Sequence, residues 1–160
     1  MSRSKADVGD SLLRRWQRLS VLPGGGWLFS FLLGRFAPYT GSIGARVKDI
    51  RPGYARVELR DRHRLRNHLN CIHAIALMNL GEVTTGLALL SGLKPGVRGI
   101  ITGLSIEYFK KARGRLVSVA ETVQPEVTGD IEHEVHADIK DQSGEVVARC
   151  TAKWRLGLIP

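Results

Sequence analysis

The hydrophobic positions of this chain follow two different periods. From about Ile43 onward most apolar side chains alternate with polar ones, which predicts strands buried on one face. One long segment differs: from about Cys71 to Leu90 the pattern is helical and nearly all apolar, and Ser91 and Pro95 end it. The predicted strands cover residues 43–47, 55–59, 102–108, 117–119, 131–139 and 146–155. The sequence therefore predicts two strands, a long helix and four further strands, in this order.

Two helical patterns precede the first strand. Residues 11–20 carry Leu and Trp at helical spacing with three arginines between them, and residues 27–36 are mostly apolar. Pro23 and the three glycines that follow it separate the two segments. We predict an α+β fold in which an antiparallel sheet is wrapped around the long central helix. Residues 1–41 would form an N-terminal helical extension, and residues 42–160 a single domain.

The charge of the chain is concentrated in its first half. Residues 1–70 contain 14 Lys and Arg against 5 Asp and Glu, and residues 71–160 contain 10 of each, so the net charge of +9 lies upstream. Such an excess favours an anionic partner. The basic helix at 11–20 is either a cap on the domain or a peripheral membrane contact. Two cysteines without CxxC spacing and the absence of a secretory signal pattern predict a cytoplasmic location.

A single acid interrupts the apolar central helix. Glu82 is the only Asp, Glu, Lys or Arg between Cys71 and Leu90, and a carboxylate in apolar surroundings is costly unless it is paired or used chemically. Asn67 and His73, at the start of the same segment, can polarise a carbonyl group. This combination indicates acyl chemistry; the alternative is that Glu82 is hydrogen-bonded at a helix interface.

These residues resemble the active-site pattern of a known family. Asn67, His73 six positions later and Glu82 nine positions beyond that are similar to the hotdog-fold acyl-CoA thioesterases of the phenylacetyl-CoA and hydroxybenzoyl-CoA type. The likeness covers roughly residues 42–157 in the order of elements. It implies that Glu82 attacks the thioester carbonyl or activates a water, and that Asn67 holds the carbonyl or the water. The amides near His73 and Ala74 would polarise the carbonyl oxygen.

The residues after His73 and the geometry of the helix bear on the acyl pocket and on the oligomeric state. The family usually has His-Gly-Gly where this chain has His73-Ala74-Ile75, so the two additional side chains are expected to narrow the acyl pocket. Nine residues at about 100° each turn a helix through about 900°, which places His73 and Glu82 on nearly opposite faces. We therefore predict a homodimer, or a dimer of dimers forming a homotetramer, in which Glu82 of one chain meets Asn67 and His73 of the other.

Two basic groups are candidates for binding the phosphates of coenzyme A. One follows the predicted strand 102–108, where the resembled family often contacts the nucleotide, and the other lies in the loop before the central helix. Some of these side chains are expected to be merely solvated. Thr102 is a further polar candidate near the thioester. The predicted substrate-binding residues are Thr102, Lys110, Lys111, Arg113, Arg64 and Arg66.

Other functions stay open at this point. A hotdog dehydratase also uses a histidine and a carboxylate, on acyl-carrier-protein substrates. A non-catalytic acyl-CoA-binding or nucleic-acid-binding module would suit the basic first half, but no nucleic-acid-binding motif is present and no nucleic-acid partner is expected. A thiol nucleophile at Cys71 with His73 as its base is disfavoured, because residues two apart on a helix do not face each other. The histidines and acids have no metal-ligand spacing, so neither a metal nor another cofactor is expected.

Overall fold

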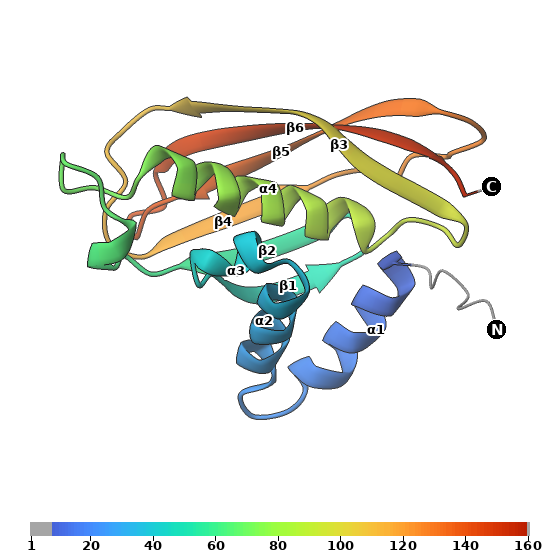
Figure 1. Cartoon of the computed structure of the whole chain (residues 1–160), viewed down its shortest axis with the longest axis horizontal. Helices are drawn as coiled ribbons and strands as arrows, with labels where there is room; N and C mark the ends of the chain where they lie inside the picture. The colour runs from blue at the N-terminus through green and yellow to red at the C-terminus, as the bar shows by residue number, and fades with distance from the viewer. Residues whose placement is uncertain (1–7, 160) are drawn as a thin grey trace.

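The sheet is antiparallel and wraps around one long helix, as Figure 1 shows for the computed structural model, which describes residues 8–159. The strands are β1 (Arg46–Arg51), β2 (Tyr54–Leu59), β3 (Val97–Tyr108), β4 (Leu116–Glu121), β5 (Ile131–Lys140) and β6 (Val146–Leu158). The helices are α1 (Val8–Ser20), α2 (Gly25–Phe36), α3 (Pro38–Ser42) and α4 (Ala74–Leu90), with a short 3-10 turn at His63–Leu65. The strands follow the spatial order β1-β2-β4-β5-β6-β3. The predicted fold class is confirmed.

The central helix α4 is buried along most of its length. Its 17 residues span about 25 Å and cross the concave face of the sheet (Figure 1). Leu80, Thr84 and Ala88 are completely enclosed. A helix that is apolar on nearly every side must be covered by other elements, and here the sheet and α3 cover most of it. The same enclosure leaves little water around any polar side chain on α4.

Strand β3 lies at one edge of the sheet and pairs only with β6 among the described strands. A register shift between Ile101 and Gly103 makes Thr102 the extra residue of a bulge. Beyond the bulge, Leu104 and Tyr108 lie opposite Ala152 and Ala148, which are buried beneath α4. Residues directly opposite in an antiparallel pair share a face, so Leu104 and Tyr108 lie on the inner face of the sheet. Both are nevertheless exposed.

The helical extension packs against the β1 edge of the sheet. Trp16 of α1 and Phe29 of α2 are both buried and meet edge to face, with ring centroids 5.2 Å apart. Ser30 ties α2 to the sheet because its Oγ accepts a hydrogen bond from the amide of Val47 (2.9 Å). The two helices expected at 11–20 and 27–36 are confirmed, each starting slightly earlier. Residues 1–7 of the predicted extension lie outside the described residues, and its boundary with the domain stays a prediction.

Several predicted element boundaries are wrong: β3 begins at Val97 and not at Thr102, β6 runs on to Leu158, and two other elements begin later than predicted. The central helix begins at Ala74 and not near Cys71, because Ile72 and His73 donate their amides to Ala112 and Leu65 instead of entering a helical ladder. The first strand begins at Arg46 rather than Ile43, which follows α3 directly. In both cases the apolar pattern runs past the end of the element, since side chains in the adjoining loop are also buried.

Two glycines of α4 provide a matched test of how closely the helix approaches the sheet. A Cβ at Gly81 would lie 2.2 Å from the Cβ of Cys150, whereas a Cβ at Gly86 would meet the ring of Trp154 at an ordinary 3.5 Å. We expect Gly81→Ala to lower the free energy of unfolding by about 1–3 kcal/mol through overpacking. Gly86→Ala should raise it by up to about 1 kcal/mol, because alanine favours the helix. Urea unfolding measures both, and equal effects would contradict the described contact.

Candidate active site

Asn67 organises the loop that leads into α4. Its side-chain Oδ1 accepts hydrogen bonds from the backbone amides of Leu69 (3.0 Å) and Cys71 (3.4 Å). Its backbone amide donates to the carbonyl of Cys71 (2.9 Å). Asn70 adopts a left-handed conformation with φ of 55°, which asparagine tolerates better than most residues. These hydrogen bonds hold the loop in one compact conformation. They use the side-chain oxygen of Asn67 and leave its side-chain nitrogen available for a ligand.

His73 is the N-cap of α4. Its Nδ1 accepts a hydrogen bond from the amide of Ile75 (3.1 Å), so the proton of the neutral ring is on Nε2. The first amides of a helix have no intrahelical partner, and since Ile75 is used by His73, the amide of Ala74 is left to bind a carbonyl oxygen. His73 also borders a cavity of about 210 Å³ between α3 and the loop before α4. The start of α4 thus offers two N–H donors, the backbone amide of Ala74 and Nε2–H of His73.

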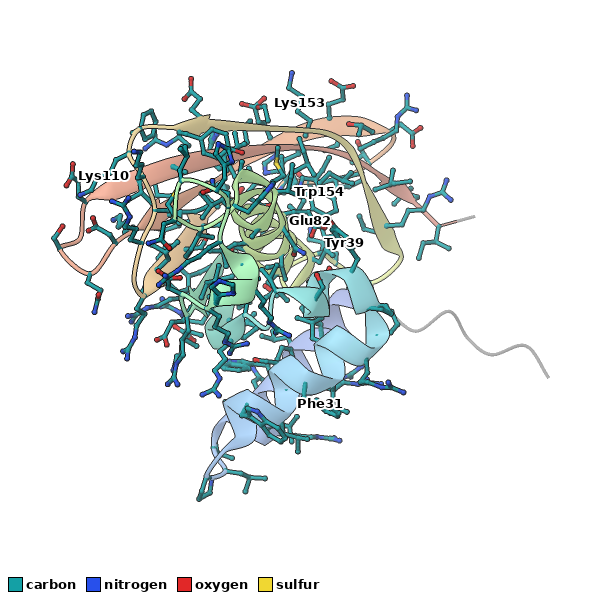
Figure 2. All side chains as sticks on the ribbon, turned by 60° about the vertical axis from the view of Figure 1, so that its left-hand side comes forward. Phe31, Tyr39, Glu82, Lys110, Lys153 and Trp154 are labelled. Atoms are coloured by element: carbon teal, nitrogen blue, oxygen red, sulfur yellow. The ribbon has the colours of Figure 1, made fainter. Side chains whose placement is uncertain are left out.

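Glu82 is half-buried on α4, and no described side chain forms an ion pair or hydrogen bond with its carboxylate. Burial raises the pKa of this carboxyl above its ordinary value. Beneath it, burial and the Glu82 charge raise the pKa of the Cys150 thiol to about 11. The predicted isolation of the acid is therefore found in the folded chain. Figure 2 shows Glu82 in the middle of the molecule, away from the Lys110 end.

This raised pKa gives a direct prediction for the pH dependence of catalysis. If ionised Glu82 is the base or nucleophile, kcat/KM should fall as the pH drops through the pKa of Glu82, with a midpoint above the value of about 4.3 typical of an exposed glutamate. Steady-state rates across pH 4–9 would show the midpoint, with folding checked at each pH. A midpoint at or below the ordinary value would contradict the burial of the reacting carboxyl.

Glu82 cannot reach the free amides at the start of α4 in its own chain. Ala74 and Glu82 are eight residues apart on one helix, which separates them by about 12 Å along the axis. His73 precedes the helix, so the predicted placement of His73 and Glu82 on opposite helical faces is wrong; their separation along the axis keeps them apart instead. One thioester bound at the start of α4 is thus out of reach of the same chain's Glu82.

The two predicted basic groups lie side by side around the Asn67 loop. Arg66 donates to Asp61 (2.7 Å) and to Oδ1 of Asn70 (2.9 Å), and Arg113 donates to the carbonyl of Asn70 (3.2 Å). Asp61 also accepts from the amide of Gly114 (2.9 Å). Hydrogen bonding to Arg66 lowers the pKa of the Asp61 carboxyl. The loop before α4 and the loop after β3 therefore form one basic surface.

The remaining predicted substrate-binding residues differ in their surroundings. Lys110 pairs with Asp141 (2.7 Å) and with Glu145. Arg64 borders the 210 Å³ cavity, and neither Arg64 nor Lys111 pairs with any described carboxylate. Thr102 donates to the carbonyl of Lys153 (3.2 Å) within the sheet. Arg64 and Lys111 are thus free to meet an anion, while Arg113 is held by the carbonyls of Leu69 and Asn70. The substrate contacts of all six residues stay predictions.

Sequence reasoning missed two residues beside the candidate site. Tyr108 donates its hydroxyl to the carbonyl of Ala74 (3.1 Å), linking the edge strand β3 to the first turn of α4. Asn79, which is buried, donates to the carbonyl of Tyr39 in α3 (3.0 Å), and no described group donates to its Oδ1. The alternating pattern places Tyr108 on the inner face, but it carries no information on which helix turn that face meets.

The fold is shared with several solved structures. A structural-genomics crystal structure, APC5556, superposes with a TM-score of 0.79 at 30% identity, covering 94% of this chain and 98% of that one. PA5026 of Pseudomonas aeruginosa, named a protein of unknown function and probable thioesterase, gives 0.74 at 22% identity, covering 86% and 97%. A thioesterase family protein from Silicibacter pomeroyi gives 0.69 at 19%, covering 81% and 96%. The comparison with curated proteins found no match.

These likenesses define a hotdog-fold protein, so the resemblance inferred from Asn67, His73 and Glu82 is confirmed at the level of the fold family. A family model described as a domain of unknown function, DUF4442, matches residues 25–156. The chain belongs to this family. The match begins at the first residue of α2, so the family includes α2 and α3 as well as the sheet and α4.

Proposed function

We propose that this protein is a cytoplasmic acyl-CoA thioesterase that hydrolyses its substrate in sites shared between the two chains of a homodimer. The observation that carries the proposal is Glu82, a half-buried carboxylate with a raised pKa and no described partner. A structural role would leave this carboxylate satisfied by a neighbouring donor. A titratable group perturbed in this way is typical of catalytic sites.

The shape of the chain supports a two-fold dimer through the β3 edge. Ile75, Met78 and Glu82 occupy one face of α4, at positions i, i+3 and i+7, and this face is only partly covered. It adjoins the exposed inner side chains Leu104 and Tyr108 of β3. An unpaired edge strand beside an uncovered apolar face is a surface that a second copy would cover. Antiparallel pairing of two β3 strands would bring the two α4 helices side by side.

In this dimer the chemistry divides between the chains. The thioester oxygen would accept hydrogen bonds from the amide of Ala74 and from Nε2 of His73 in one chain. Ionised Glu82 of the other chain would take a proton from a water, whose oxygen attacks the carbonyl carbon. The tetrahedral intermediate then collapses, the C–S bond breaks, and the CoA thiolate leaves and takes the proton that Glu82 accepted from the water. Direct attack by Glu82, followed by hydrolysis of the resulting anhydride, uses the same groups.

The nucleotide end of coenzyme A would lie on the basic surface around the Asn67 loop. Arg64 and Lys111 are available there, Arg66 and Lys110 hold the loops through their ion pairs, and Arg113 donates to the carbonyl of Asn70. Guanidinium and ammonium groups bind phosphate through charge-assisted hydrogen bonds. The phosphates would then lie near the start of α4, on the same side as the donors for the carbonyl.

The experiment that tests the proposed function is a measurement of thiol release from aryl-, medium-chain and long-chain acyl-CoAs by the wild-type protein, with its oligomeric state determined in parallel. Turnover of one class would support the proposal and identify the acyl group. A folded dimer that turns over none of them would contradict it. Water loss from a 3-hydroxyacyl thioester would then indicate a dehydratase, and binding without turnover would indicate a carrier.

A further inference from the structure

Helix α2 presents a row of large apolar side chains to solvent. Trp27, Phe31 and Phe36 are 56%, 53% and 83% exposed, and Trp27 and Phe31 stack with ring centroids 5.7 Å apart. We call this the α2 apolar face; it consists of Trp27, Leu28, Phe31, Leu32 and Phe36. Phe31 points away from the body of the protein in Figure 2. Clusters of this kind on a soluble chain mark an interaction site.

The rest of the fold does not use this face. The opposite side of α2 packs against the protein, where Phe29 contacts Trp16 and Ser30 accepts the hydrogen bond from Val47. Helices α1 and α2 lie below the sheet in Figure 1, on the β1 side and away from the β3 edge. A dimer formed through β3 would therefore leave the α2 apolar face uncovered.

The helices next to and including the α2 apolar face carry mostly positive charge. Residues 8–42 contain four arginines against one acid, Asp10, which pairs with Arg14 (3.0 Å). Arg15 and Arg18 are exposed on α1, and Arg35 is exposed on α2. Exposed aromatic side chains bordered by arginines are the pattern of helices that lie at the interface of an anionic bilayer. No helix within residues 8–159 is long and apolar enough to cross a membrane.

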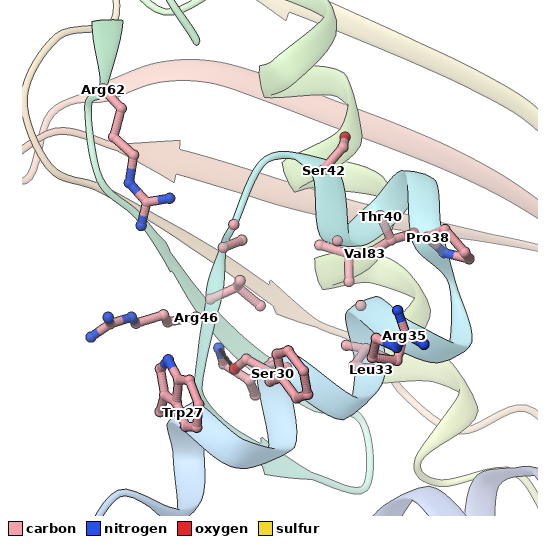
Figure 3. A pocket seen from close by; sticks show the side chains of 17 residues that line it. Trp27, Ser30, Leu33, Arg35, Pro38, Thr40, Ser42, Arg46, Arg62 and Val83 are labelled. Carbon is pink, nitrogen blue, oxygen red and sulfur yellow. Dashed lines mark hydrogen bonds between the residues drawn. The ribbon is translucent and has the colours of Figure 1, made fainter. Parts of the chain in front are cut away.

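A cavity of about 420 Å³ opens beside the same face. Trp27 and Phe31 form part of its wall, Val57 of β2 and Val83 of α4 lie deeper, and Arg46 and Arg62 also border it (Figure 3). This volume is in the range of sites for small molecules, and the mixture of apolar walls with arginines suits an anionic molecule that has an apolar chain. An opening next to the α2 apolar face favours a lipid surface over a protein as the partner.

We propose that the α2 apolar face binds the surface of a bilayer that contains anionic lipids, with the arginines of α1 and α2 at the headgroups. Trp27 and Phe31 then lie at the level of the headgroups, and the 420 Å³ cavity opens toward the lipid. The binding does not depend on catalysis by Glu82. It can therefore be measured, and can fail, separately from the thioesterase activity.

The experiment is a titration of the full-length protein with phosphatidylcholine vesicles that contain or lack phosphatidylglycerol. Trp16 and Trp154 are buried, so a change in tryptophan emission reports Trp27. We expect a blue shift and cosedimentation with the anionic vesicles, both weakened by salt. Trp27→Phe should lose the blue shift and keep the cosedimentation. No blue shift and no cosedimentation with anionic vesicles would overturn the proposal.

Two variants and two controls locate the surface. Phe31→Ser combined with Leu32→Ser should weaken vesicle binding at least about tenfold. Replacing Arg15 and Arg18 by Gln should weaken it about fivefold for each arginine. Val123→Ser removes an exposed apolar side chain from a loop, and Lys153→Gln removes a charge from the opposite side of the molecule (Figure 2); both should bind as the wild type does.

A second copy of the chain is the competing occupant of this face. In that case, Phe31→Ser with Leu32→Ser would reduce the oligomeric state in solution, and the wild-type protein would not bind anionic vesicles, which overturns the proposal. Thermal melting checks the folding of each variant. If the Phe31 and Leu32 variant does not fold, the Arg15 and Arg18 variant decides: unchanged vesicle binding by that variant would also overturn it.

Discussion

Replacing Glu82 by Gln is expected to abolish thioester hydrolysis and to make the folded protein more stable at neutral pH. The loss of a positioned base or nucleophile should lower kcat by about 10²–10⁴-fold. The amide has nearly the same shape as the carboxyl group, so the fold and the dimer should persist. Thiol release from the best acyl-CoA measures the first effect, and thermal unfolding at several pH values measures the second.

The gain in stability follows from the raised pKa of Glu82. Because the folded state binds the proton more tightly than the unfolded state, stability is lost as the pH rises from the unfolded-state pKa of Glu82 to its folded-state pKa, and the full cost remains at higher pH. Gln cannot ionise, so Glu82→Gln should melt higher than the wild type at pH 7. The difference should shrink as the pH falls through the folded-state pKa and vanish below about 4.3, where an unfolded glutamate is also protonated.

Glu132→Gln is the matched control. Glu132 is exposed on β5, and its replacement makes the same change of charge without touching α4. Its activity and melting temperature should stay close to those of the wild type. A Glu82→Gln protein that keeps wild-type turnover would remove Glu82 from the mechanism, and one that melts lower at pH 7 would show that the carboxylate is satisfied in the assembled protein.

Mixing two inactive variants is expected to restore activity if the sites are shared between chains. In a heterodimer of Glu82→Gln and His73→Ala, one site carries both changes and the other carries neither. Random assembly makes half of the dimers heterodimers, so about a quarter of the wild-type activity should return in the mixture and about half in the purified heterodimer. Coexpression with two different tags, followed by purification through both, gives the heterodimer for the assay.

A second pair of variants provides the control for this result. Asn67→Ala and His73→Ala both change the side of the site that precedes α4, so a heterodimer of the two has no intact site and should stay inactive. Recovery with Glu82→Gln but not with Asn67→Ala would establish the shared arrangement. If neither pair recovers activity, although both form heterodimers, the site lies within one chain, contrary to the separation of about 12 Å along α4.

Local patterns were sufficient to predict most of the fold and the identity of the central acid. Alternation identified the strands, the apolar helical run identified α4, and the isolation of Glu82 in that run marked it for chemistry. These features depend on the backbone period and on composition, which are properties of short segments. The predicted start of α4 is too early because Cys71 and Ile72 are apolar as well. The amides of Ile72 and His73 donate to the carbonyls of Ala112 and Leu65, and these bonds keep the segment out of the helix.

The surroundings of the candidate site were decided by tertiary structure alone. Tyr108 meets Ala74, 34 positions earlier in the chain, and Arg113 meets Asn70, 43 positions earlier. Such contacts follow from the strand order and from the bulge at Thr102, which no local period encodes. The same holds for the exposed edge of β3 and the uncovered face of α2. A residue's type and spacing show what chemistry it can perform, but its partners depend on how distant segments pack.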